Sequence, residues 1–130
     1  MKEELKDKLR ENYPALFENI TYISCGDGWY SLLDLLGSKI TNYVNFKRDH
    51  QNIELSVKAM QIKEKFGGLR FYVSGSDPYI NGMISFAENY SYKVCTVCGN
   101  PSSEQKERGW IYTMCEPCQK QKLKKEVYSC

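Results

Sequence analysis

Two closely spaced cysteine pairs near the carboxyl end constrain this chain more than any other feature of its sequence. Two residues separate Cys95 from Cys98 and Cys115 from Cys118, and sixteen residues lie between the pairs. This spacing lets each pair bind the same ion from a tight knuckle. The longer gap forms a loop or hairpin that brings the second pair to the opposite side of the tetrahedron. The sequence therefore predicts one structural zinc ion, because four thiolates leave no open position for catalysis.

The length, composition and net charge of the chain indicate an ordinary cytoplasmic domain. The chain has 130 residues, of which 42% are hydrophobic and 26% are charged, with a formal net charge of only +2; such a composition is typical of globular proteins. Residues 1–7 lack the apolar core of a secretory signal, and no stretch of sequence supplies the ~18 apolar residues of a membrane span. Of the two unpaired cysteines, Cys130 ends the chain and Cys25 is expected to be a partly buried, unreactive thiol.

Helical patterns dominate the first ninety residues. Residues 3–12 form an amphipathic pattern that a proline ends. The strongest three- and four-residue period follows Asp27, which is expected to cap a helix running to about Phe46. Asp77 precedes a proline and a further apolar pattern, which predicts a capped helix to about Tyr90.

A β-hairpin is predicted between these helices. Residues 61–66 and 69–73 are rich in strand formers and flank Gly67-Gly68, a strong signal for a two-residue turn. With that turn, Lys65 faces Arg70, and Lys63 faces Tyr72, all on one side of the hairpin. Glu64 is the polar exception on the opposite, apolar side. Residues 53–60 are ambiguous between a strand and a helical turn.

The polar side of this hairpin is a candidate ligand site. Like charges directly opposite one another destabilise a strand pair, so Lys65 beside Arg70 indicates an anion above them. We therefore predict that Lys63, Lys65, Arg70 and Tyr72 contact a phosphate or a base–phosphate unit. The alternative is a solvated strand whose lysines discourage edge pairing. Further candidates from the cysteine-rich tail are Trp110 and Arg108.

These elements together predict an α+β fold. Residues 1–92 are expected to form a helix-rich body with a β-hairpin or small antiparallel sheet. Residues 93–130 are expected to form a zinc-binding appendage, similar to a zinc ribbon or a treble-clef knuckle, with a basic C-terminal helix.

The run from Lys63 to Tyr72, KEKFGGLRFY, resembles a string found in small proteins of bacteria and bacteriophages. In those proteins the string also precedes two CxxC knuckles with an intervening tryptophan, here Trp110. The segment Gly26-Asp27-Gly28-Trp29 ahead of a helix fits the same group, so the resemblance spans residues 24–118. It implies a phage or mobile-element setting, in which such proteins act on host machinery by binding nucleic acid, a nucleotide signal or a host protein. No settled activity is attached to the group.

Three classes of function follow from these observations. The preferred one is a non-enzymatic binder of a phosphate-bearing ligand, either nucleic acid or a nucleotide. The alternative is a protein-interaction module, or an inhibitor of a host protein, that uses the zinc knuckle and exposed aromatic side chains. An enzyme is the weakest class, because the sequence shows no paired carboxylates, no histidine near a nucleophile and no phosphate-binding loop. The oligomeric state does not follow from the sequence.

Overall fold

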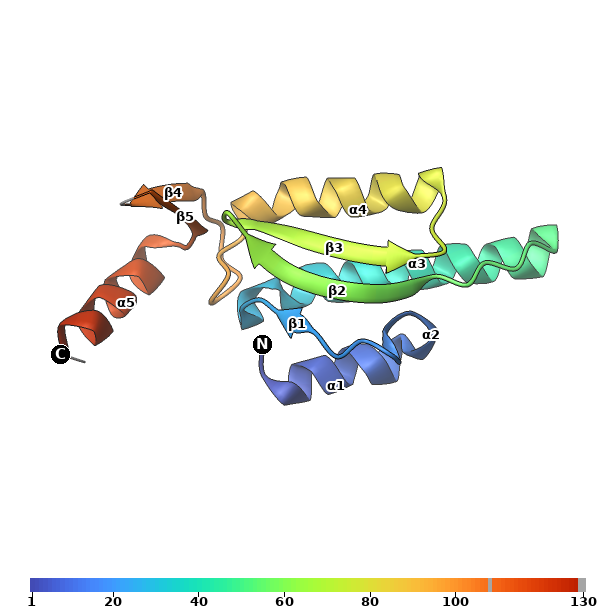
Figure 1. Ribbon diagram of the computed structural model, residues 1–130, viewed down its shortest axis with the longest axis horizontal. Coiled ribbons are helices and arrows are strands. Elements are labelled where there is room, and N and C mark those ends of the chain that lie inside the picture. The colour runs from blue at the N-terminus through green and yellow to red at the C-terminus, as the bar shows by residue number, and fades with distance from the viewer. Residues whose placement is uncertain (108, 129–130) are drawn as a thin grey trace.

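The computed structural model describes residues 1–107 and 109–128 and confirms the α+β fold class (Figure 1). Arg108, one of the predicted ligand contacts, lies outside the described residues, as does Cys130. In chain order the elements are α1 (Glu3–Asn12), α2 (Pro14–Phe17), β1 (Ile23–Ser24), the 3-10 turn η1 (Asp27–Trp29), α3 (Tyr30–Gln51), β2 (Lys58–Lys65), β3 (Gly68–Ser74), α4 (Pro78–Tyr90), the 3-10 turn η2 (Ser91–Lys93), β4 (Glu104–Glu107), β5 (Trp110–Thr113) and α5 (Glu116–Tyr128).

One core holds the body together between a three-stranded sheet and its helices. The sheet order is β1-β2-β3, and α3 crosses behind β2 and β3 while α4 runs beside β3 (Figure 1). The buried apolar stripes meet in this core, with Phe17 of α2 edge-on to Phe71 of β3 at 6.2 Å between ring centroids. Its largest fully buried side chains are Trp29, Phe17, Leu9, Ile20, Leu33, Ile40, Ile62, Leu69 and Ile80.

The helices match the predicted pattern except at α3. The predictions for residues 3–12 and 78–90 are confirmed by α1 and α4, and Asp77 caps α4 by accepting the Ile80 N–H at 2.8 Å. The prediction that Asp27 caps the long helix is wrong, because α3 begins at Tyr30 after a 3-10 turn. The Asp27 carboxylate instead accepts the backbone N–H of Lys2 at 2.8 Å, at the start of α1.

The hairpin turn lies one residue earlier than predicted. Phe66 and Gly67 occupy the two central turn positions, both with positive φ (55° and 82°), as a type I′ turn requires. Gly68 is already in β3, opposite Lys65. The reason is tertiary: a Cβ at Gly68 would stand 2.3 Å from the ring and hydroxyl of Tyr92. Any side chain at this strand position would require the Tyr92 ring to move, so the second glycine serves packing and not the turn.

Two features of the body were not predicted. β1 pairs with β2 in parallel, through Ile23 opposite Ile62, and adds a short third strand to the hairpin. The short helix α2 begins at Pro14, the same proline that was predicted to end the first helix.

Among helices of residues 1–107 and 109–128, none combines the length and apolarity needed to cross a membrane.

Candidate metal centre and cationic face

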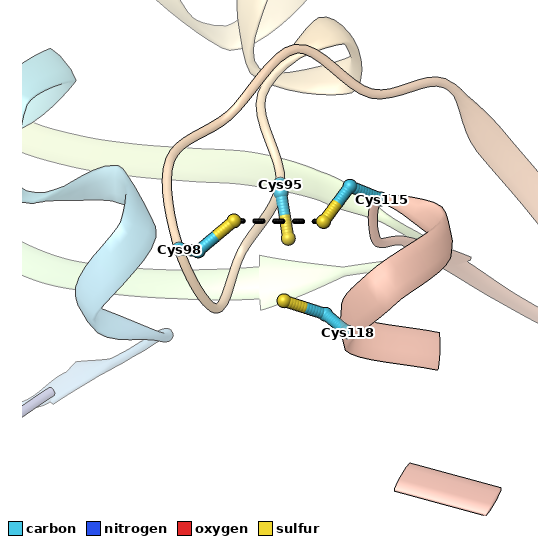
Figure 2. Close-up of side chains that lie close together, drawn as sticks. All are labelled: Cys95, Cys98, Cys115 and Cys118. Carbon is cyan, nitrogen blue, oxygen red and sulfur yellow. Dashed lines mark hydrogen bonds between the residues drawn. The ribbon is translucent and has the colours of Figure 1, made fainter. Parts of the chain in front are cut away.

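The four paired cysteines converge on one point (Figure 2). Their sulfur atoms all lie within 4.8 Å of one another, and the Sγ atoms of Cys98 and Cys115 are 3.5 Å apart. A disulfide would bring two sulfurs to about 2.0 Å, whereas ligands ~2.3 Å from a tetrahedral ion lie about 3.8 Å from each other. The cluster therefore has the geometry of a metal site and can hold one ion.

Two different local structures supply the two pairs. The first pair lies in a tight loop, where the Gly99 N–H donates to the Cys95 carbonyl at 3.0 Å and Gly99 adopts φ 80°. The second pair lies at the start of α5, with Cys118 in its first turn. The hairpin β4–β5 joins the pairs, with Glu104 opposite Thr113. A knuckle, a hairpin and a helix in this order match the treble-clef alternative better than the ribbon.

The electrostatics of the cluster favour a cation at its centre. Burial raises the pKa of Cys95, but N–H groups of Cys115, Cys98 and Val97 donate to its sulfur and bring the pKa down to about 6. Burial and the neighbouring cysteine side chains raise the pKa of Cys118, because a second thiolate beside the first is disfavoured. A divalent ion resolves this conflict, since its charge stabilises all four thiolates together. A set of four sulfur donors suits zinc or iron.

The loop Gly26–Trp29 docks the first knuckle onto the body. The Gly28 N–H donates to the Thr96 carbonyl at 3.0 Å, and Trp29 Nε1 donates to the Val94 carbonyl at 2.9 Å. Both glycines are required by this close approach: a Cβ at Gly26 would stand 1.9 Å from the Thr96 carbonyl oxygen, and one at Gly28 would stand 2.1 Å from the Cys95 carbonyl oxygen. The motif noted in the sequence is thus a support for the metal-binding backbone.

A second contact joins the turn between β2 and β3 to strand β5. The buried hydroxyl of Thr113 donates to the Gly67 carbonyl at 2.7 Å, and the Thr96 N–H donates to the Thr113 carbonyl at 3.0 Å. Gly67 therefore touches β5, the strand that leads to the second cysteine pair. The hairpin turn of the body and the cysteine-rich segment are therefore joined by direct hydrogen bonds.

The four predicted hairpin residues share one face of the sheet, here called the cationic face (Lys63, Lys65, Arg70 and Tyr72). Their pairing differs from the prediction, because the turn at Phe66 and Gly67 places Lys63, and not Lys65, directly opposite Arg70. The side of the sheet to which each residue points is unchanged, because the partner of Arg70 shifted by two residues along β2 and strand side chains alternate with a period of two. The like-charged pair across β2 and β3 is therefore real, with a different lysine in it.

Arg70 is held by a residue that the sequence did not single out. Its Nη1 donates to the Leu69 carbonyl at 3.0 Å, and both terminal nitrogens lie 3.4 Å from the Tyr92 hydroxyl. The hydrogen bonds to Tyr92 raise the pKa of Arg70, so the guanidinium is a permanent cation. The signal for Tyr92 in the sequence is weak, because it is one of ten tyrosines and lies 22 residues from Arg70.

No carboxylate of the described residues forms an ion pair with the cationic face, although the charge of Glu88 on α4 acts on Arg70. The ion pairs within 4.0 Å are made by other cations, namely Lys2, Lys6, Arg10, Arg48, Lys58 and Lys120. Lys63 instead lies over the Tyr72 ring, 5.6 Å from its centroid, and that ring is 44% exposed.

Trp110 does not belong to the cationic face. It is 67% exposed and lines a separate recess of about 370 Å³ at the junction of body and knuckle, together with Glu64. Glu64 lies on the side of the sheet opposite Lys63, and its Oε1 accepts the Gly67 N–H at 2.6 Å. The structure thus separates the predicted tryptophan contact from the predicted hairpin contacts and gives Glu64 a role in the turn.

Comparison of the chain with protein families, curated proteins and solved structures found no match. The site is therefore interpreted from its own chemistry.

Proposed function

We propose that this protein is a zinc-stabilised, non-enzymatic binding protein of the cytoplasm that captures a phosphate-bearing ligand on its cationic face. The observation that carries the proposal is Lys63 directly opposite Arg70, with neither side chain in an ion pair within 4.0 Å among the described residues. Like charges so placed destabilise the hairpin, and the attraction of both cations to a bound phosphate would offset that repulsion. Zinc is the proposed metal because a closed shell of four ligands, often four thiolates, is typical of structural zinc sites.

The chemistry of the face suits a nucleotide unit of either nucleic acid or a small nucleotide. Arg70 uses three hydrogen bonds on Leu69 and Tyr92, which leaves two of its five N–H donors for a phosphate. Lys63 and Lys65 add two mobile point charges. Tyr72 offers an exposed ring beside these cations, and aromatic rings next to basic side chains stack on bases whatever their sequence.

Oligonucleotide binding by a charge-reduced variant tests the proposal. A labelled single strand of twenty thymidines is titrated with the zinc-loaded protein at several salt concentrations. Three phosphate contacts on a single strand give a log–log salt slope of about −2. The double variant Lys63→Ser/Arg70→Ser should bind at least ~10-fold more weakly with a slope near −0.7, while its unfolding midpoint stays equal or rises slightly.

The matched control is Lys8→Ser/Arg48→Ser, which removes the same two charges from helix surfaces outside the face. It should retain binding within about 2-fold. Equal losses in both double variants would show that only net charge matters, and unchanged binding in the first would remove the site. Competition by mononucleotides separates the two ligand classes: displacement at similar concentration indicates a nucleotide site, and weak displacement indicates a polynucleotide site.

A protein-interaction module remains the second candidate, because Trp110 is 67% exposed beside the junction recess. The resemblance to small phage proteins makes a host protein the partner in that case. Binding through Trp110 would depend little on salt and would survive the Lys63→Ser/Arg70→Ser change, which the first candidate would not.

A further inference from the structure

An apolar groove of about 930 Å³ runs between α3 and α4 and is lined only by residues of these two helices. On α4 its side chains recur as Tyr79, Met83, Phe86 and Tyr90, at the alternating four- and three-residue steps of a helix-packing seam. Phe86 is 75% exposed, the largest value among the exposed large hydrophobic residues of the described chain. Exposed apolar patches of this kind mark interaction surfaces.

Gly82 lies inside this seam and has no explanation within the described fold. It occupies the interior of α4, where glycine destabilises a helix relative to alanine. Its φ is not positive, and apart from its chain neighbours and the backbone of its own helix no atom lies within 4 Å of the position that a Cβ would take. Neither the backbone nor packing requires glycine here. Its effect is a hollow in the floor of the groove, where another chain can approach the α4 backbone.

The groove is complementary to itself. The most exposed knob, Phe86, and the hollow at Gly82 lie four residues apart, about 6 Å along one face of the same helix. In an antiparallel crossing of two α4 helices about a two-fold axis between these residues, each Phe86 enters the hollow of the other copy. A surface with a knob and its matching hole one turn apart satisfies the requirement of an isologous interface.

Charge and area agree with a second copy. The lining residues contain one charge, Lys39, and no carboxylate, and a lysine at the margin can extend its ammonium group to water. Phe86, Tyr79 and Tyr90 are 75%, 61% and 49% exposed. At ~150–250 Å² for a whole aromatic side chain, they alone offer on the order of 300–450 Å², about half of the ~800 Å² that each partner of a standard interface buries.

We propose that the α3–α4 groove is a self-association surface through which two copies of this chain form a symmetric dimer. This inference does not depend on the proposed phosphate site, which lies on the sheet and not on these helices. The dimer presents two cationic faces.

Sedimentation velocity of the zinc-loaded full chain over a concentration series tests the dimer. The wild type should show a concentration-dependent dimer, and Phe86→Glu should weaken it at least ~100-fold, because it replaces the most exposed ring of the groove by a charge that dimerisation would have to desolvate. The matched control Met60→Glu changes an apolar side chain that is 59% exposed on β2, and it should leave the dimer intact.

Gly82→Ala gives a second readout with opposite signs. It should raise the thermal midpoint of the monomer, measured at low concentration, by about 3–5 °C, and weaken the dimer ~10-fold or more by filling the hollow. A wild type that stays monomeric at several hundred micromolar would overturn the proposal and leave the groove to a helix of another protein. A dimer that persists in Phe86→Glu would overturn it too.

Discussion

The Gly28→Ala variant isolates the contact between the body and the metal-binding backbone. The added methyl group would stand 2.1 Å from the Cys95 carbonyl oxygen and 2.6 Å from the Gly99 nitrogen, both in the knuckle that carries the first cysteine pair. No flexible side chain can move away, because the atoms in its path are backbone. The knuckle must shift or detach from η1.

The magnitude follows from two effects. Overpacking a filled site costs ~1–3 kcal/mol, and displacement of the Gly28 N–H from the Thr96 carbonyl loses a further ~1 kcal/mol. Metal ligands tolerate distance errors of only about 0.2 Å, whereas relief of this contact needs a larger shift. If the whole cost of about 2–4 kcal/mol falls on the metal-loaded state, zinc affinity drops by about 30- to 700-fold.

Zinc competition with a chromophoric chelator under reducing conditions measures this loss. Elemental analysis of the wild type should first give one zinc per chain. Gly82→Ala is the matched control, because its methyl group meets no atom within 4 Å, and its zinc affinity should equal that of the wild type. Circular dichroism checks that Gly28→Ala retains its helices. If Gly28→Ala binds zinc as tightly as the wild type, the loop does not support the site and this reasoning is refuted.

Two further predictions concern the body. Asp77→Ala should lower the free energy of unfolding in urea by about 1–2 kcal/mol, because the Ile80 N–H loses its cap; the exposed Asp49→Ala should change it by less than ~0.5 kcal/mol, and similar losses in both would refute the capping role. Burial raises the pKa of Cys25 from 9.0 to about 11, so its alkylation at pH 8, followed by mass spectrometry, should be ~100-fold slower than in urea. The stability linked to this proton is present below pH 9 and is lost as the pH rises towards 11; alkylation at the same rate in both states would contradict the burial.

Local interactions explain the features that the sequence predicted correctly. The Asp77 cap acts on an N–H three residues away, and each cysteine pair spans one knuckle or one helical turn. The residues involved lie within a few positions of one another in the sequence, so local interactions are sufficient to predict these features. The ends of α1 and α4 and the four cysteines that could hold a metal ion could therefore be predicted from the sequence.

The hairpin shows where this reasoning stops. Both Gly67-Gly68 and Phe66-Gly67 can form a two-residue turn by local preference, and glycine alone would favour the first. The ring of Tyr92, more than twenty residues away, occupies the space of a side chain at Gly68 and so favours glycine at that position in the strand. The choice changed which lysine faces Arg70, while the face that carries the charges stayed the same because strand side chains alternate with a period of two.

The sequence alone determined which atoms can hold the metal and which side of the hairpin is positively charged, because both depend on spacing along a short stretch of chain. Only the tertiary structure decided how the metal knuckle is supported, what holds Arg70 in place, and that α3 and α4 leave an apolar groove uncovered. The physical reason is separation: Trp29 and Val94 are 65 residues apart in the chain, yet they are joined by a hydrogen bond of 2.9 Å. Contacts of that kind exist only once the whole chain has packed.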